Sequence, residues 1–100
     1  MMQNNPGTWE AIEEDVMVED QLGSLSELIV YNDDVNTFDW VIESLMDICK
    51  HSFEQAEQLS MIVHFKGKAI VKTDSFNILR PMKDALCDRG LSAVIESIKV

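Results

Sequence analysis

The side chains with the clearest chemical content are three consecutive polar residues, Asn32, Asp33 and Asp34, and a single histidine, His64. Amide and carboxylate oxygens and a neutral imidazole nitrogen are all hydrogen-bond acceptors, so together they suit a small cation. The cation is either a divalent metal ion or an ammonium group. Adjacent aspartates lack the alternate spacing of a calcium loop, and one histidine gives little selectivity for a metal.

The same residues also allow a purely structural interpretation. Asn32, Asp33 and Asp34 follow an aliphatic segment and precede a predicted helix, where such residues commonly form a turn and cap the helix. His64 stands between two apolar residues, and a lone histidine in that setting is often partly buried and hydrogen-bonded within the protein. From the residue types alone, the cation site and the structural role both stay open.

Negative charge is concentrated in the first part of the chain. The formal net charge of the 100 residues is −10. Residues 1–40 hold ten Asp and Glu and no Lys or Arg, whereas residues 41–100 hold eight residues of each sign. Nucleic acid and anionic membranes are poor partners for such a surface, because neutralising phosphates requires clustered Lys and Arg. A cationic ligand or a basic patch on a protein fits better.

No arrangement typical of a catalytic centre is visible. Cys49 and Cys87 are 38 residues apart, form no CxxC, and belong to no motif that would pair either with a histidine. The chain contains no glycine-rich phosphate loop, and His51 and His64 form no zinc motif. We therefore expect a binding protein without a metal or other cofactor, and not an enzyme.

The sequence also lacks the common signals for membrane insertion and export. No apolar run approaches the roughly 20 residues that span a bilayer. The first residues lack the basic and apolar regions of a secretory signal. We therefore expect the protein to act in the cytoplasm.

Residues 1–25 differ in composition from the rest of the chain. They contain few aliphatic residues, show no sustained periodicity, and include Pro6, Gly7 and Gly23. We expect a flexible acidic N-terminal extension over residues 1–25 and a folded domain over residues 26–100. Whether the extension has a function or only keeps the protein soluble stays open.

The folded domain alternates short β-rich segments with stretches of helical periodicity. The strand candidates are aliphatic and β-branched and are bounded by turn-forming residues. In the helix candidates apolar residues recur at spacings of three and four, and Ser52 with Gln55 forms a capping-box pattern before the second helix. The predicted strands are residues 27–31, 67–72 and 92–98, and the first two predicted helices are residues 37–50 and 52–65.

A third helix is predicted between residues 73–76, which offer cap residues, and Gly90, which suits the position after a helix end. Pro81 complicates this helix, because a proline in mid-helix loses a hydrogen bond and clashes with the preceding turn at a cost of about 3 kcal/mol. We therefore expect the regular helix to begin near Arg80, with Pro81 in its first turn. The order β-α-α-β-α-β then predicts an α+β fold with three helices packed on one face of a small three-stranded antiparallel sheet.

The stretch from Leu28 to about Lys72 resembles the bacterial Clp protease adaptor family, ClpS. The pattern of that family is an aliphatic strand ending in NDD, a helix, and a second helix ending in VHxxGxA. The chain carries this pattern as LIVYNDD at 28–34, FDWVIESL at 38–45, EQAEQLSMIVH at 54–64 and HFKGKA at 64–69. The C-terminal GLSAVIESI is also similar to the last strand of the family. NDD at this distance before VHxxGKA is specific. With the C-terminal segment included, the resemblance covers the whole predicted domain apart from the region between Val71 and Arg80.

The resemblance implies an adaptor of the bacterial N-end rule. Such an adaptor binds proteins with a bulky hydrophobic N-terminal residue and delivers them to a Clp AAA+ unfoldase and its peptidase. The resemblance implies that Asn32 and His64 contact the substrate α-amino group. It also implies that Asp33 is a further, negatively charged acceptor for that group. Two alternatives stay open: a protein-interaction module that kept the fold but lost recognition of N-terminal residues, and a divalent-metal-binding domain.

The resemblance also implies a hydrophobic pocket for the first side chain of the substrate. The matching positions are Asn36, Phe38, Val41, Ser60, Val63 and Ala93. Phe38 stands where the family usually has Met, Ser60 where it often has Met or another large residue, and Ala93 where it often has Leu. Smaller residues at two wall positions predict a roomier cavity, and Phe38 narrows its gate. The preference among Leu, Phe, Tyr and Trp is left open.

The chain departs from the family pattern between Val71 and Arg80. There KTDSFNILR replaces the family's glycine and a helix-opening stretch with a Glu-Thr-Lys element, and the segment is shorter by a few residues. In the family this surface contacts the N-domain of the unfoldase. The resemblance implies that Asn77, Arg80 and Lys83 would make that contact, and which unfoldase is the partner stays open.

Overall fold

The computed structural model describes residues 25–98. Residues 1–24 and 99–100 lie outside the described part, and so does almost all of the predicted extension over residues 1–25. The elements are β1 (Ser26–Tyr31), α2 (Phe38–Cys49), α3 (Phe53–Lys66), β2 (Lys68–Asp74), α4 (Phe76–Asp88) and β3 (Ser92–Ser97). The predicted order β-α-α-β-α-β is confirmed.

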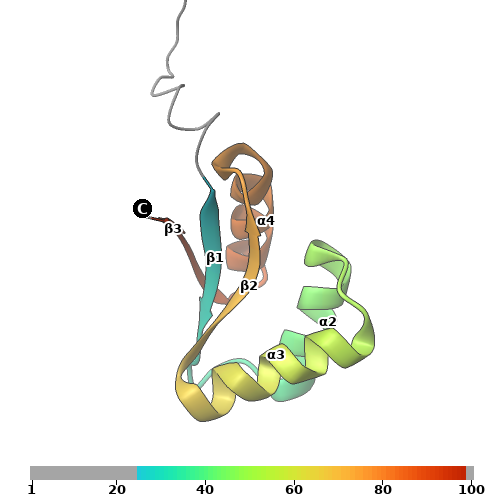
Figure 1. Ribbon diagram of the computed structural model, residues 1–100. Coiled ribbons are helices and arrows are strands. Elements are labelled where there is room, and N and C mark those ends of the chain that lie inside the picture. Colours follow the sequence, from blue (N-terminus) through green and yellow to red (C-terminus); the bar gives the residue numbers. More distant parts are fainter. Residues whose placement is uncertain (1–24, 99–100) are drawn as a thin grey trace, which may run out of the picture.

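The three strands form one antiparallel sheet in the order β2-β1-β3, with β1 in the centre (Figure 1). Strand β1 pairs Val30 with Ala69 of β2 and with Ala93 of β3. Side chains alternate across a strand, so these three residues lie on one face of the sheet. That face is the one on which the helices pack, as the α+β prediction required.

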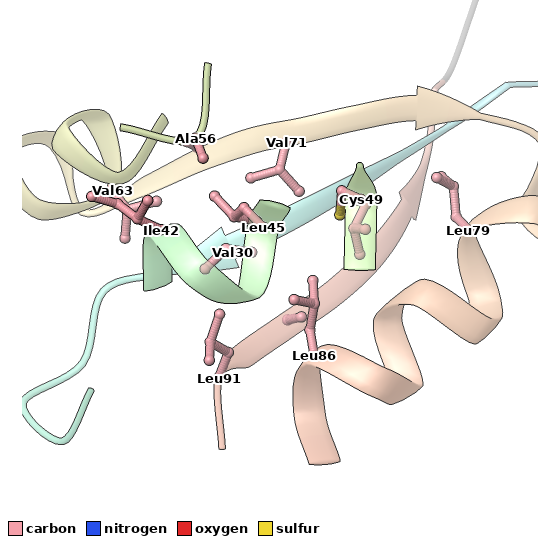
Figure 2. Packing of buried hydrophobic residues seen from close by; sticks show 13 residues of the cluster. Val30, Ile42, Leu45, Cys49, Ala56, Val63, Val71, Leu79, Leu86 and Leu91 are labelled. Carbon is pink, nitrogen blue, oxygen red and sulfur yellow. The ribbon is translucent and has the colours of Figure 1, made fainter. Parts of the chain in front are cut away.

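The core lies between this face and the three helices. Figure 2 shows Leu45 of α2, Val63 of α3 and Leu86 of α4 pointing toward the sheet residues Val30 and Val71. All of these side chains are at most 4% exposed. Burying a side chain of this size contributes roughly 1.5 to 3 kcal/mol each, so the helices are held to the sheet mainly by this cluster. In the described part of the chain, no helix is long and apolar enough to cross a membrane.

The ends of α2 and α3 follow from local sequence signals. Thr37 caps α2 by accepting a hydrogen bond from the Trp40 backbone N–H at 3.1 Å. Ser52 and Gln55 form the predicted capping box at the start of α3. Helix α3 ends at Lys66 and is capped by Gly67, whose φ of 94° favours glycine.

The predicted start of the third helix is wrong. Helix α4 begins at Phe76 and not near Arg80, and Pro81 lies inside it. The N–H groups of Ile78 and Leu79 both donate to the Ser75 carbonyl at 3.1 Å, so the helix is already formed before the proline. Leu79 is fully buried in the core, and its burial offsets the hydrogen bond that the proline removes.

Candidate functional site

The loop between β1 and α2 is organised by the carboxylate of Asp33. Its Oδ1 accepts hydrogen bonds from the backbone N–H groups of Val35 and Asn36, each at 2.9 Å. Its Oδ2 accepts from the Asn36 side-chain amide at 2.9 Å and from the Ser92 hydroxyl at 3.4 Å. The Asn36 backbone N–H is the main cause that lowers the pKa of Asp33 from its ordinary value, while partial burial opposes it. Asp33 is therefore ionised at neutral pH.

Asn36 ties this loop to the turn between α4 and β3. Its side-chain amide donates to the Gly90 carbonyl at 2.8 Å as well as to Asp33. Gly90 has a φ of 91°, as its predicted position after the end of α4 requires. Asn36 was predicted as a pocket residue, and it also holds the loop in place.

Asn32 and His64 are brought together by the end of α3. The Asn32 backbone N–H donates to the Gly67 carbonyl at 2.9 Å, which joins the loop after β1 to the residue that ends α3. His64 lies in the last turn of α3, with its ring edge-on to the Phe65 ring at a centroid distance of 4.7 Å. Both Asn32 and His64 are exposed and line the same pocket.

The pocket formed between the β1–α2 loop, α2 and α3 has a volume of about 540 Å³. Its polar lining residues are Asn32, Asp33, Asp34, Asn36, Ser60 and His64. Its apolar lining residues are Phe38, Val41, Met61, Val63 and Phe65. Hydrogen-bond acceptors and hydrophobic walls therefore meet in one cavity, which suits a ligand with a cationic group next to an apolar group.

Ala93 is the predicted pocket residue that does not line this cavity. It is 6% exposed and belongs to the hydrophobic core, where it pairs with Val30 across β1 and β3. The reason is its register on β3, which turns its side chain into the core beneath the helices. The other predicted site residues, Asn32, Asp33, Asn36, Phe38, Val41, Ser60, Val63 and His64, all line the pocket.

Met61 and Phe65 also line the pocket, and neither is among the pocket residues predicted from the sequence. They are 43% and 74% exposed, and they lie four residues apart on α3, so they share one side of the helix. Large exposed apolar side chains are typical of binding sites when they gather beside a cavity. The signal in the sequence that would have identified them is their position on either side of His64.

The metal-site alternative has no support in the described residues. Within residues 25–98, no group of three or more His, Cys, Asp and Glu side chains could hold a metal ion. Both carboxylate oxygens of Asp33 already accept hydrogen bonds from the protein. Asp33, Asp34 and His64 therefore share a pocket without forming a metal cluster.

The predicted docking residues lie on α4, away from this pocket. Asn77 and Arg80 are exposed, and Lys83 is partly exposed. None of the three lines the pocket between α2 and α3. The Lys83 ammonium forms an ion pair with Asp84 at 2.9 Å, and this contact raises the pKa of Lys83 and lowers that of Asp84. Arg80 and Lys83 are one turn apart and present two cations on one surface of α4.

Comparison with known proteins supports the resemblance that the motifs suggested. Residues 23–93 match the family model for the ATP-dependent Clp protease adaptor protein ClpS. The ATP-dependent Clp protease adapter protein ClpS of Shewanella halifaxensis is 38% identical over 69 residues, which are 69% of this chain and 68% of that protein. The protein of the same name from Edwardsiella ictaluri is 43% identical over 47 residues, which are 47% of this chain and 44% of that protein.

A solved structure has the same fold. It is the structure of Agrobacterium tumefaciens ClpS2 bound to L-phenylalaninamide, with a TM-score of 0.72 and 21% sequence identity. The match covers 75% of this chain and 98% of that chain, so the α+β prediction is confirmed over nearly the whole of the known domain. The family model and the relatives that match it are of protease adaptors and not of enzymes. The chain belongs to the ClpS family of adaptors of the ATP-dependent Clp protease.

Proposed function

We propose that this adaptor binds the free α-amino group and the bulky hydrophobic first side chain of its substrates, and delivers them to a Clp AAA+ unfoldase in the cytoplasm. The observation that carries the proposal is the pocket in which Asn32 and His64 lie beside Phe38, Val41 and Val63. Acceptors and apolar walls in one cavity match the two features that define such an N-terminus. The alternative is an interaction module of the same fold that does not read N-termini.

The chemistry of an N-terminal ammonium fits the acceptors of the pocket. An ammonium has three donors and no acceptor, and each hydrogen bond to a charged group contributes about 1.5 to 3 kcal/mol. Burial of a Leu or Phe side chain contributes roughly 1.5 to 3 kcal/mol more. Two such bonds, to Asn32 and His64, contribute about 3 to 6 kcal/mol. Neither the ammonium nor the side chain alone therefore reaches the roughly 8 kcal/mol that corresponds to a Kd of 1 μM. Both parts must be recognised together.

Asp33 has a different task from Asn32 and His64 in this proposal. Its two oxygens already accept four hydrogen bonds from the loop and from Ser92, and a carboxylate has about four acceptor positions. We therefore infer that Asp33 acts on the ammonium mainly through its negative charge and by fixing the loop that carries Asn32.

The ligand of the structural relative supports the proposal by its chemistry. L-phenylalaninamide, which is bound to Agrobacterium tumefaciens ClpS2, carries a free α-amino group next to a benzyl side chain. These are the two groups that the acceptors and the apolar walls of this pocket would take.

Delivery requires a second surface, for which we propose the exposed side of α4 with Asn77, Arg80 and Lys83 as the contact to the unfoldase N-domain. The domain organisation, with an acidic extension over residues 1–25 before an adaptor domain over residues 26–100, is also a proposal. Its support is the composition of residues 1–25, which lie outside the described part of the chain except for Leu25.

The recognition of a free N-terminus is tested by isothermal titration with a short peptide that begins with Phe and with its N-acetylated twin. We expect the free peptide to bind and the acetylated one to lose at least about 100-fold in affinity, because acetylation removes the charge and two of three donors. Equal affinities for the two peptides would favour the interaction module. A response to calcium or manganese would revive the metal-site alternative.

The two histidines of the chain provide a matched pair of variants. His64→Ala removes a pocket acceptor and should weaken binding of the Phe peptide about tenfold or more. His51→Ala removes the other imidazole, which bonds the Val71 carbonyl at 2.7 Å outside the pocket, and should leave the affinity unchanged. Equal losses for both variants would show that His64 acts only through the stability of the fold.

A further inference from the structure

One polar atom next to the pocket has no partner. Ser60 of α3 is 2% exposed, and its Oγ makes no hydrogen bond within the described residues. Buried hydroxyl groups are nearly always hydrogen-bonded, since an unpaired one loses its bonds to water without compensation. Ser60 is nevertheless a lining residue of the pocket, whose apolar lining residues include Val41 and Val63. A buried, unpaired hydroxyl that lines a pocket is suited to form a hydrogen bond with a ligand atom.

The position of Ser60 relative to His64 indicates which ligand atom that is. The two residues are four apart on α3, so they are separated by about 6 Å along the helix axis. If the ammonium lies at His64, this is roughly the span of a tyrosine side chain from its α-carbon to its phenolic oxygen. The Ser60 hydroxyl can turn among three staggered positions about one bond, so it can meet that oxygen without a backbone movement.

We propose that Ser60 makes the pocket prefer an N-terminal tyrosine to an N-terminal phenylalanine, by pairing its hydroxyl with the phenol. This inference rests on the proposed function, because it assumes that the first side chain of the substrate enters the pocket. A phenol that enters a pocket with purely apolar walls loses its bonds to water and is disfavoured relative to a phenyl ring. Ser60 reverses that preference, since each hydroxyl supplies both a donor and an acceptor.

Ser44 offers a control within the same molecule. It is fully buried on α2, and its Oγ also lacks a partner within the described residues, but it is not a lining residue of the pocket. Replacement of either serine by alanine removes one unpaired oxygen and nearly preserves the side-chain volume. The variants Ser44→Ala and Ser60→Ala should therefore both melt at or above the temperature of the unchanged chain.

The test is a set of titrations with two peptides that differ only in Tyr or Phe at the first position. For the unchanged chain we expect the Tyr peptide to bind about 2- to 10-fold more tightly. Ser60→Ala should abolish or invert this ratio, while Ser44→Ala should keep it. The four affinities from the Ser60 pair form a double-mutant cycle, which isolates the contact between the two hydroxyl groups.

The outcomes separate this inference from the proposed function. If both peptides bind but Ser60→Ala leaves their ratio unchanged, or if the unchanged chain binds Phe as well as Tyr, the inference is overturned and the proposed function stands. If neither peptide binds the unchanged chain, the proposed function fails and the inference fails with it. A ratio lost equally in Ser44→Ala and Ser60→Ala would assign the effect to packing of the two helices and would also overturn it.

Discussion

The pocket and the outer surface of α4 are fixed in different ways. At the pocket, hydrogen bonds that Asn36 donates to the Asp33 carboxylate hold the loop, and the bond from Asn36 to the Gly90 carbonyl links it to a distant turn. On α4, the buried Leu79 and Leu86 anchor the helix to the core, whereas the Arg80 side chain is exposed. The geometry of the pocket loop is thus set by hydrogen bonds within the protein, whereas the proposed docking residues on α4 lie at the surface.

The largest effect is expected from the residue that holds the pocket loop. Asp33→Ala removes four accepted hydrogen bonds and a negative charge beside the proposed ammonium site. We expect a loss of about 3 kcal/mol in the binding of a Phe-initiated peptide, which is on the order of 100-fold. Isothermal titration measures this loss, and thermal unfolding should show a lower melting temperature.

Asp34→Ala is the matched control, since Asp34 is exposed and lines the same pocket. It should cost less than tenfold in affinity and leave the melting temperature nearly unchanged. Equal losses at both positions would show that charge alone matters and that the loop geometry does not.

The pH dependence of stability provides a second control for Asp33. The pKa of this carboxyl in the folded chain is lowered below its unfolded value of about 3.9, so its stabilising contribution is complete above that value. The contribution is lost as the pH falls through the folded pKa. The free energy of unfolding of Asp33→Asn should therefore fall less steeply with acid than that of the unchanged chain. Between pH 6 and pH 8, residue 33 should add no pH dependence to the stability of either protein.

The same contrast explains what could be predicted from the sequence. The capping box of Ser52 and Gln55 was found because its signal is local. The NDD loop and His64 were found because a motif links them across 30 residues, and the structure brings them to one pocket. Ala93 was predicted to line the pocket, but it lies in the core. The sequence did not indicate this, because the face on which a β3 side chain lies depends on the register with β1.

The start of α4 was missed for a related reason. The local rule for Pro81 favoured a helix beginning at Arg80. Burial of Leu79, which no local rule contains, extends the helix back to Phe76. Tertiary packing therefore determined where the helix with the proposed docking residues begins. The pocket loop is held by hydrogen bonds, among them the long-range bond from Asn36 to the Gly90 carbonyl.

A moderate effect, in the opposite direction, is expected on α4. Pro81→Ala restores the N–H that can donate to the Asn77 carbonyl and removes the clash of the proline ring in an exposed helix interior. The unfolded chain gains some freedom, so we expect a net stabilisation of about 1 to 2 kcal/mol, measured by denaturant unfolding. Peptide affinity should not change, because Pro81 does not line the pocket.

Arg80→Ala is the control for this variant, since it changes an adjacent exposed side chain and leaves the backbone N–H in place. Its effect on the free energy of unfolding should stay below about 0.5 kcal/mol. A destabilised Pro81→Ala variant would contradict the expected gain from restoring the N–H and removing the clash of the proline ring.

The smallest effect on the adaptor alone is expected from a charge reversal on the surface of α4. Arg80→Glu should leave the melting temperature and the affinity for a Phe-initiated peptide unchanged, because Arg80 contacts neither the core nor the pocket. Its affinity for a Clp unfoldase N-domain should fall a few-fold at low salt, with most of the difference lost at high salt, since exposed charges at the rim of an interface are screened. Lys50→Glu, which changes another exposed side chain at the end of α2, should not alter that affinity.

If Arg80→Glu binds the N-domain normally at low salt, the contact to the unfoldase lies elsewhere, and the exposed cations of α4 only keep that surface solvated. If it instead weakens peptide binding, the two regions are coupled through the link from Asn36 to Gly90, and the division between pocket and docking surface does not hold.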